Sequence, residues 1–509
     1  MVKTERTTSL APKENNRILF IHPPQSKSRD GNREGLNVKI PLGFLYMAGS
    51  LEKEGFEVKI LDCLLYYKQK RIIDNTTVKI GLFPDQIIEV IKEFNPGIVG
   101  VSCAYSPYES DSFEIIDLVR KNFKDILIVV GGAHSSANSE HVLRNKNIDL
   151  VVIGEGELTI VEIAQNFISG KSLKRITGTA IRDKGKIIIN KPREYIKDLD
   201  LLRPAWHLIN LNKYFEHPNN SLATMRKNSI DIITSRGCPG NCVFCSIHTV
   251  WGRGWRARSP KNIVDEIEFL SKTYNSKQFR IQDDNLTLNK NRTIEICNEI
   301  IKRNLDVKWD TPNGIAIWTL DEELLLKMKQ AGCYRVTFGI ESGSPSTQKY
   351  IGKIIDLKKL DRLVNFCNKI GLWVCGTFII GFPNETIEDI KKTENYIISS
   401  KINFPFIYIA QPYQGTRMYE DFKKHHLIKD FRCRSNVSET KYNTTKFTSQ
   451  ELNNLLKNIN RKFYIKKILS YTNPLIFYSE FLSKIKSYED LKYVKKMVVA
   501  ILFKSRKLS

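Results

Sequence analysis

Residues 235–245 read Ser-Arg-Gly-Cys-Pro-Gly-Asn-Cys-Val-Phe-Cys and place Cys238, Cys242 and Cys245 in one short loop after an apolar run. The spacing is Cys-x3-Cys-x2-Cys. Three thiolates so close together can hold an iron–sulfur cluster or a metal ion, because soft thiolate ligands favour iron–sulfur centres and zinc. In a cluster of four irons, these cysteines would leave one iron without a protein ligand.

Two simpler metal sites fit the loop less well. Zinc would need a fourth ligand, and His248 stands at Cys-x2-His spacing from Cys245, but structural zinc sites usually use paired cysteine knuckles. A ferredoxin would need a fourth nearby cysteine and Cys-x2-Cys-x2-Cys spacing. The remaining cysteines are single and mostly in apolar surroundings, as is typical of small buried side chains: Cys63, Cys103, Cys297, Cys333, Cys367, Cys375 and Cys433.

The sequence around the loop alternates apolar runs with segments of helix length. Each apolar run ends in polar or glycine residues, and the expected strands are 231–234, 279–282, 307–311, 334–340, 373–380 and 406–410. Six such units predict a partial parallel barrel over residues 226–425. Chemistry in barrels of this type gathers at the C-terminal ends of the strands.

The N-terminal part of the chain predicts a second α/β domain over residues 17–165. Its apolar runs are continuous and are separated by segments of helix length, as in a parallel sheet covered on both faces: 18–21, 58–61, 98–101, 126–130 and 150–153. This is the pattern of a doubly wound, Rossmann-like domain, which binds ligands beyond the C-terminal ends of its strands.

Three further segments complete the expected organisation. Residues 1–16 form a polar leader without the apolar stretch of a signal peptide. Residues 166–225 read as a connector with a β-hairpin, whose turn is Arg182-Asp-Lys-Gly185. Residues 426–509 are basic and predict mostly helix.

Composition and charge narrow the class of protein. The 509 residues are 41% hydrophobic and 26% charged, ordinary values for a globular protein, and carry a formal net charge of +24. No apolar run approaches the roughly 20 residues that cross a bilayer, so we expect a cytoplasmic protein.

The basic residues are spread along the chain except in 441–509, which holds 15 Lys and Arg against 4 Asp and Glu. Solvated helical faces explain this excess, and contact with a membrane surface is the alternative.

At the cysteine loop the sequence resembles the radical S-adenosylmethionine (SAM) enzymes, whose signature is Cys-x3-Cys-x-aromatic-Cys with Phe244 as the aromatic residue. The resemblance covers roughly residues 226–425. It implies that the three cysteines hold a [4Fe–4S] cluster, that SAM binds the free iron, and that its reductive cleavage yields a 5′-deoxyadenosyl radical. It also implies SAM contacts at the ends of three strands: Asp283, Asp284 and Asn285 after the second, Glu341 and Ser342 after the fourth, and Gly376 and Gly381 at the fifth.

A doubly wound domain before such a barrel resembles the cobalamin-binding subgroup of these enzymes. Glycines at strand ends let the backbone approach a flat macrocycle. The contacts that the resemblance implies are Gly43, Ser102, Gly131, Gly132, His134, Gly154, Gly156 and Glu157. The domain lacks the Asp-x-His-x-x-Gly segment that supplies a lower axial histidine in another cobalamin family. The alternative is a domain kept for packing or dimerisation, with His134 as a hydrogen-bonded turn residue.

The resemblance therefore implies a cobalamin-dependent radical SAM enzyme, most simply one that methylates an unactivated carbon of a biosynthetic intermediate. Oxidative cyclisation or rearrangement without net methylation is the first alternative. A transfer-RNA methylthiotransferase would need a second three-cysteine site in the N-terminal domain, where only Cys63 and Cys103 occur. A non-catalytic, metal-bound nucleic-acid module is a further alternative, and it predicts salt-dependent binding without SAM turnover.

The expected partners follow from the same interpretation. Residues 250–260 contain three arginines and two tryptophans, which suit either an anionic substrate or a structural lid over the cluster. We expect a small-molecule substrate, an electron donor such as flavodoxin or ferredoxin, and no stable nucleic-acid complex. Peripheral membrane contact would involve the basic C-terminal region.

Overall fold

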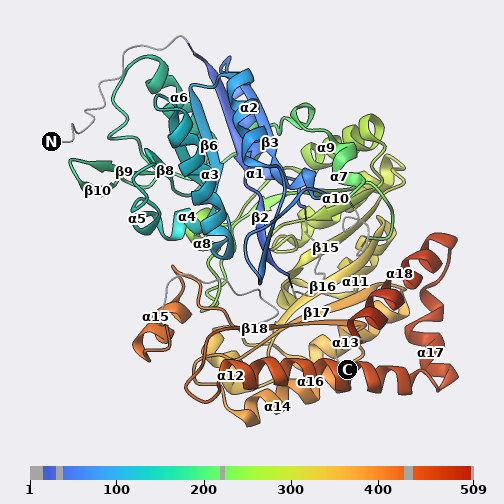
Figure 1. Cartoon of the computed structure of the whole chain (residues 1–509). Coiled ribbons are helices and arrows are strands. Elements are labelled where there is room, and N and C mark those ends of the chain that lie inside the picture. Colours follow the sequence, from blue (N-terminus) through green and yellow to red (C-terminus); the bar gives the residue numbers. More distant parts are fainter. Residues whose placement is uncertain (1–14, 30–37, 218–223, 429–439, 506–509) are drawn as a thin grey trace. The chain divides into compact units, whose positions relative to one another are not determined.

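The computed structural model describes residues 15–29, 38–217, 224–428 and 440–505, with side chains described up to residue 497. The described chain divides into two compact units (Figure 1). Unit 1 comprises 15–29, 38–217 and 246–252, and unit 2 comprises 224–245, 253–428 and 440–505. Most of the expected leader, and Cys433, lie outside the described residues.

Unit 1 is built on a seven-stranded sheet of order β10-β9-β8-β7-β6-β1-β3. Five neighbouring strands are parallel and coincide with the expected apolar runs: β1 (Arg17–His22), β3 (Glu57–Asp62), β6 (Ile98–Ser102), β7 (Leu127–Gly131) and β8 (Leu150–Val152). The doubly wound α/β fold is therefore confirmed.

Successive residues of β1 pack into two different cores, as a sheet covered on both faces requires. Ile18 and Phe20 belong to one core and Leu19 and Ile21 to the other. Helices α1 (Leu42–Lys53) and α6 (Glu157–Ile168) supply the first core, and α2 (Pro84–Phe94) and α3 (Glu109–Asn122) supply the second. The short helices α4 (Ala133–Ala137) and α5 (Ser139–Val142) follow β7.

The hairpin expected in the connector belongs to the sheet of unit 1. Its strands are β9 (Thr179–Asp183) and β10 (Lys186–Ile189), and β9 pairs antiparallel with β8. This pairing satisfies the backbone groups along one edge of β8, which would otherwise be exposed. The compact unit thus extends to 217, beyond the expected boundary at 165.

A small antiparallel sheet in unit 1 was not expected from the sequence. It contains β2 (Gln25–Ser28), β5 (Thr77–Ile80) and β4 (Lys70–Ile72) in that order. These strands are short and largely polar, so they lack the apolar pattern on which the prediction of strands depends.

Unit 2 contains the expected partial barrel as a six-stranded parallel sheet of order β11-β14-β15-β16-β17-β18. The strands are β11 (Ser229–Ile232), β14 (Gln278–Ile281), β15 (Lys308–Ile315), β16 (Cys333–Glu341), β17 (Trp373–Ile380) and β18 (Phe404–Ile409). The helices between them are α9 (Pro260–Tyr274), α10 (Lys290–Lys302), α11 (Glu322–Gln330), α12 (Pro345–Ile351), α13 (Leu357–Lys369) and α14 (Ile387–Ser399). A two-stranded ladder, β12 (Ser235–Arg236) with β13 (Arg256–Ala257), brackets the cysteine loop.

The C-terminal region is mostly helical, as expected, with α16 (Ser449–Ser470), α17 (Pro474–Glu480) and α18 (Tyr488–Ser505) after α15 (Arg417–Lys424). Its last helix, α18, packs where β16 and β17 begin. Tyr493 of α18 shares a core with Tyr334 and Trp373, and its hydroxyl accepts a hydrogen bond of 3.2 Å from the buried Arg335. The start of α16, by contrast, lies at the end of β17, because a Cβ at Gly381 would lie 3.1 Å from the side chain of Leu452.

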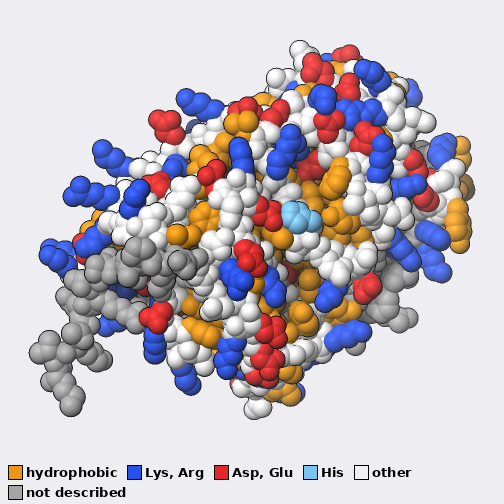
Figure 2. Space-filling view, turned by 90° about the horizontal axis from the view of Figure 1, so that it is seen from above, with side chains coloured by type: hydrophobic (Ala, Val, Ile, Leu, Met, Phe, Trp, Pro, Cys, Tyr) orange, Lys and Arg blue, Asp and Glu red, His pale blue; other side chains and the backbone are white. Residues whose placement is uncertain are grey.

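The surface shows no single basic patch on the side that Figure 2 presents. Lys and Arg side chains are scattered among Asp and Glu there, in keeping with a charge that is spread along the chain. Among the helices that the structure describes, none has the length and apolarity needed to span a bilayer.

Candidate active site

The three cysteines of the loop are partly exposed, whereas the other described cysteines are buried. Gly240 leaves the space between two of them open: a Cβ atom there would lie 3.3 Å from Sγ of Cys238 and 3.9 Å from Sγ of Cys242. A larger residue would therefore intrude between thiols that are expected to bind one group.

A zinc ion and a [4Fe–4S] cluster require different arrangements of their protein ligands. Among the described residues, no three His, Cys, Asp or Glu side chains converge as ligands of one metal ion. A mononuclear zinc site needs such convergence, whereas a four-iron cluster binds each thiolate to a different iron and keeps the thiolates apart. The partly exposed loop therefore fits a cluster whose thiolates bind different irons.

Replacing Gly240 by valine is expected to weaken cluster assembly while leaving the fold intact. Overpacking of this kind costs about 1–3 kcal/mol, and here it acts on the space between Cys238 and Cys242. Iron and sulfide bound per chain after anaerobic reconstitution would measure the effect, with Gly254→Val as the control because nothing lies within 4 Å of a Cβ at Gly254. Full iron content in Gly240→Val would contradict this assignment.

Backbone contacts hold the loop independently of any cluster. The amide of Val243 donates to the carbonyl of Ile351 at 3.1 Å, and its own carbonyl accepts from the amide of Met418 at 3.0 Å. Arg417 donates to the carbonyl of Asn241 at 2.9 Å. The ends of α12 and the start of α15 thereby fix the middle of the loop.

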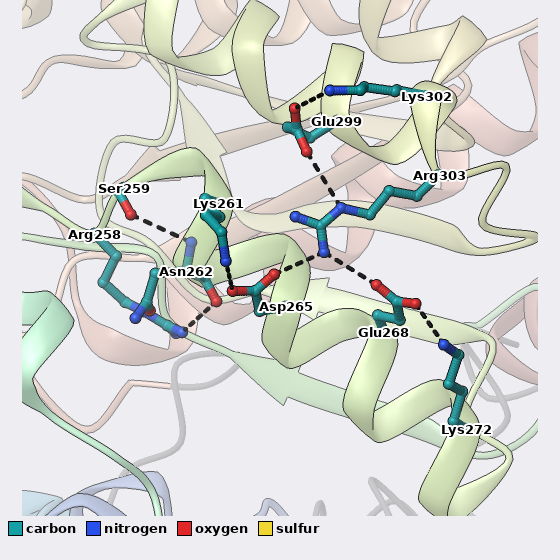
Figure 3. Close-up of polar contacts among 10 residues, drawn as sticks. All are labelled: Arg258, Ser259, Lys261, Asn262, Asp265, Glu268, Lys272, Glu299, Lys302 and Arg303. Carbon is teal, nitrogen blue, oxygen red and sulfur yellow. Dashed lines mark hydrogen bonds and ion pairs between the residues drawn. The ribbon is translucent and has the colours of Figure 1, made fainter.

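Residues 250–260, which contain the three arginines and two tryptophans, are hydrogen-bonded to the loop and to residues near it. Arg253 donates to the carbonyl of Gly240 at 2.6 Å, and the indole of Trp255 donates to the carbonyl of Asn285 at 3.1 Å. Arg258 is buried and donates to Asn262 at 2.7 Å and to Glu266 at 2.5 Å (Figure 3 shows its contact with Asn262). These contacts favour the structural lid over a substrate-binding role for Arg253 and Arg258.

The three SAM contacts expected after β14 are Asp283, Asp284 and Asn285, and their hydrogen bonds differ. Asp283 is buried and accepts hydrogen bonds from the amide and hydroxyl of Thr234 and from the hydroxyl of Ser235, at 2.5–2.6 Å. Both of its carboxylate oxygens are used inside the chain, so it positions the start of the loop and does not suit the expected contact with SAM.

Asp284 and Asn285 remain suited to bind a ligand. The carboxylate of Asp284 accepts from the amide of Gly237 at 3.3 Å, and burial, with the nearby charge of Asp283, raises its pKa to about 7. The side chain of Asn285 is buried, and neither its oxygen nor its nitrogen has a hydrogen-bond partner. Buried amides are nearly always paired, so Asn285 is the side chain here that most needs a ligand.

Glu341 ends β16 in a strained backbone conformation. Its φ is 66°, a left-handed value that a residue with a side chain adopts at a cost and that is enriched at active sites. Its carboxylate lies 2.8 Å from the ammonium of Lys353 and accepts from the hydroxyl of Thr377 at 3.4 Å. A Cβ at Gly339 would lie 2.7 Å from that ammonium and 3.0 Å from the carboxylate, so a larger residue would displace the ends of both side chains.

Lys353 was not predicted from the sequence. Burial alone would lower the pKa of its ammonium, but Glu341 and the thiols of Cys242 and Cys238 raise the pKa above its ordinary value. The same lysine opposes the rise that burial causes in the pKa of the Cys242 thiol. Lys353 therefore joins the cysteine loop electrostatically to Glu341. It has no motif of its own that could have revealed this.

The other expected SAM contacts of the barrel are hydrogen-bonded or packed within the chain. Ser342 is buried, and its hydroxyl bonds Thr393 at 2.9 Å and accepts from the amide of Ser344 at 3.1 Å. A Cβ at Gly376 would touch Ile340 and Ile402 at 3.0 Å, which indicates tight packing. Phe244 lies on the apolar side of the loop, with its ring 6.2 Å from that of Phe382.

The segment after β17 forms a closed turn. Gly381 has a φ of 83°, and its amide donates to the buried Glu385 at 2.6 Å. Glu385 also accepts from the amide of Phe382 at 3.3 Å and from the hydroxyl of Thr347 at 3.2 Å. Burial outweighs these bonds and raises the pKa of Glu385 to about 7.

The pKa of Glu385 predicts a pH-dependent effect of Glu385→Gln. The folded chain keeps this proton up to about pH 7, whereas the unfolded chain loses it above its ordinary pKa of 4.5. The parent therefore loses stability between these values as the pH rises, by up to about 3 kcal/mol. Glutamine does not titrate, so denaturant midpoints of the variant should improve relative to the parent over this range. A difference that stays constant with pH would contradict the prediction.

In unit 1, several expected cobalamin contacts lie at the C-terminal edge of the sheet. Ser102 and Gly131 are paired ends of β6 and β7. Gly132 has a φ of 129°, and a Cβ there would lie 2.8 Å from the backbone of Cys103 and Ala104. Gly154 also has a left-handed φ, of 79°. Glycine at 132 thus allows the backbone to pass close to residues 103 and 104 at the edge where cobalamin is expected.

The other residues of unit 1 that are expected to contact cobalamin have different surroundings. Nothing lies within 4 Å of a Cβ at Gly43, whereas one at Gly156 would lie 2.6 Å from the sulfur of Met47, so Gly156 serves packing. Glu157 is buried at the start of α6. Both ring nitrogens of His134 are bonded, to Ser106 at 2.8 Å and to Glu109 at 2.9 Å. His134 is thus a hydrogen-bonded turn residue without a nitrogen for cobalt.

Comparison with known proteins identifies the family. The chain matches the Radical SAM superfamily over residues 232–397 and the B12 binding domain over residues 36–164. It is 33% identical to an uncharacterized methyltransferase of Pyrococcus horikoshii, over 88% of this chain and 93% of that protein. The chain is a cobalamin-dependent radical SAM enzyme. Its cofactors are therefore a [4Fe–4S] cluster, SAM and cobalamin, as expected from the resemblance.

Other relatives of this radical SAM enzyme include a methyltransferase and a cyclase. The cytidylyl-2-hydroxyethylphosphonate methyltransferase of Streptomyces wedmorensis is 32% identical over 75% of the chain and 77% of that protein. An anaerobic magnesium-protoporphyrin IX monomethyl ester cyclase of Rubrivivax gelatinosus is 29% identical over 74% and 64%.

Solved structures share the fold. The radical SAM methyltransferase TsrM of Kitasatospora setae has a TM-score of 0.65 at 20% identity, covering 81% of this chain and 76% of that one. The cobalamin-dependent enzyme OxsB has a TM-score of 0.68 at 17% identity, covering 96% and 76%. The order of a cobalamin-binding domain followed by a radical SAM barrel is thus confirmed, while the roles of individual residues stay predictions.

Proposed function

We propose that this enzyme methylates an unactivated carbon of a small biosynthetic intermediate. The observation that carries the proposal is that two methyltransferases match at 32–33% identity across at least three quarters of the chain. Cyclisation without net methylation is the second candidate, since a cyclase matches at 29%. Its lower identity and coverage favour methyl transfer.

Different residues of the barrel would bind the cluster and SAM. Cys238, Cys242 and Cys245 would hold the cluster, and Asp284 and Asn285 would bind polar groups of SAM at the end of β14. Glu341, held by Lys353, would bind hydroxyl groups of the nucleoside. When bound, the cluster supplies the electron that cleaves SAM, and cobalamin carries the methyl group. The chain's own part is to fix these groups close enough to react.

Two finer proposals accompany this function. The electron would come from a small reduced donor such as flavodoxin or ferredoxin, because the chain has no second cysteine cluster among its described residues. We place the enzyme in the cytoplasm, where thiols remain reduced and such donors operate.

The ratio of SAM products tests the proposal. The anaerobically reconstituted enzyme would be incubated with reductant, SAM labelled in its methyl group and the probe cytidylyl-2-hydroxyethylphosphonate. A methyltransferase forms one S-adenosylhomocysteine for each 5′-deoxyadenosine and transfers label to the probe. Magnesium-protoporphyrin IX monomethyl ester is the second probe, and 5′-deoxyadenosine without S-adenosylhomocysteine or label transfer would favour cyclisation and overturn methyl transfer.

A further inference from the structure

Helix α16 carries apolar side chains on two opposite faces. Four side chains spaced for one face are buried: Leu452, Leu456, Ile459 and Phe463. At about 100° per residue, Ile465, Ile468 and Leu469 lie on roughly the opposite side of the helix, and they are 48%, 59% and 62% exposed. A helix that packs with one face on its own barrel usually carries polar residues on the other. The outer stripe therefore needs a separate explanation.

The apolar exposure continues into α17. Leu475 is 79% exposed and Tyr478 is 61% exposed, the former being among the most exposed large apolar side chains described. The two helices are fastened together, because Lys467 of α16 bonds the buried Glu480 of α17 at 2.5 Å and the ring of Tyr471 lies 5.6 Å from that of Phe477. We call the set Ile465, Ile468, Leu469, Leu475 and Tyr478 the α16–α17 tip, which lies in the red part of Figure 1.

Cations border the tip. Arg461, Lys462 and Lys466 are exposed on the same turns of α16, and Lys462 keeps 60% of its side chain exposed while it pairs with Glu394. The nearest acid of α17, Glu480, is buried and already paired. An apolar surface with a rim of lysine and arginine is typical of helices that lie in the interface of a membrane.

A second copy of the chain would be a poor occupant of this surface. The common symmetric dimer places identical patches against each other, and here it would bring the basic rims of both copies together. Anionic lipid headgroups neutralise the same rim, because lysine and arginine are attracted to a negatively charged membrane surface. We propose that the α16–α17 tip docks this enzyme on an anionic lipid surface. The contact is peripheral, since no described helix spans a bilayer.

Vesicle sedimentation tests the proposal with the full, reconstituted enzyme. Vesicles of phosphatidylcholine alone would be compared with vesicles that also contain phosphatidylglycerol, at low and high salt. We expect binding to the anionic vesicles that weakens with salt. Ile468→Ser with Leu475→Ser should weaken it at least tenfold, and so should Lys462→Glu with Lys466→Glu. Ile301→Ser is the matched control, because Ile301 of α10 is also 43% exposed.

Three outcomes would overturn the proposal: no binding to anionic vesicles at low salt, equal binding by the tip variants and the parent, or a parent dimer that the tip variants dissociate. The last result would make the tip a protein interface. Production of 5′-deoxyadenosine at the parent's rate shows that each variant is folded, because the tip lies outside the catalytic residues. Loss of the proposed methyl transfer would not affect any of these readouts.

Discussion

Cys242→Ala is expected to abolish cleavage of SAM. With two cysteines left in the loop, the cluster loses one of its three protein ligands, and the purified variant should show little visible absorption after reconstitution. Production of 5′-deoxyadenosine should fall below detection. Iron analysis, absorption spectra and product analysis measure the result.

The loss should come from the missing ligand and not from unfolding. The backbone of Val243, next to Cys242, is held by Ile351 and Met418 through hydrogen bonds of 3.1 and 3.0 Å, and these bonds do not involve the thiol. Circular dichroism and the thermal midpoint of the cluster-free chain should therefore match those of the parent without its cluster.

A single buried cysteine provides the control for this variant. Cys367 lies within α13 and is fully buried, so Cys367→Ala removes a small apolar contact and leaves the loop unchanged. We expect this control to bind a full cluster and to cleave SAM. Substantial cleavage by Cys242→Ala, or equal loss in both variants, would show that the loop does not hold the cluster.

The strands of the two parallel sheets could be predicted because most of them contain an apolar run that is followed by polar or glycine residues. β16 is an example, since every residue from Cys333 to Glu341 is buried. The partner of the hairpin strand β9 was not predicted, because no local pattern shows that a hairpin after α6 pairs antiparallel with β8. Local pattern determines that a strand forms, and long-range packing determines where it pairs.

For the site, the sequence predicts which residues stand at the ends of the strands, but not which atoms their side chains contact. Sequence places Asp283 and His134 where ligands bind, but it does not reveal that their polar atoms are bonded within the chain. It places Asn285 equally well and does not reveal that its amide is buried without a partner. Which polar atoms are hydrogen-bonded within the chain depends on the three-dimensional fold.

Lys353→Met is expected to weaken both SAM binding and reduction of the cluster. Removing the ammonium leaves the buried carboxylate of Glu341 without the partner that lies 2.8 Å away. Removing one member of a buried, hydrogen-bonded charge pair costs about 2 kcal/mol or more, which corresponds to roughly 30-fold in affinity. Equilibrium binding of SAM to the reconstituted enzyme measures this effect.

The second effect arises because Lys353 also acts on the thiols of Cys242 and Cys238. A positive charge near a cluster favours its more negative, reduced form, so loss of the charge should make the reduction potential more negative. A redox titration monitored by electron paramagnetic resonance measures the potential without any turnover. A purely structural role for Lys353 would leave the potential of the assembled cluster unchanged.

Two further variants separate charge from geometry at this position. Lys353→Arg keeps the charge and should preserve most of the potential, while its planar fork alters the contact with Glu341 and lowers SAM affinity. Lys349→Met removes an exposed lysine of α12 only four residues away and should change neither quantity. If Lys353→Met binds SAM and takes up electrons as Lys349→Met does, then the lysine is dispensable and Glu341 is held by the strained backbone of β16 alone. If only the potential moves, the charge acts on the cluster and the link to nucleoside binding is wrong.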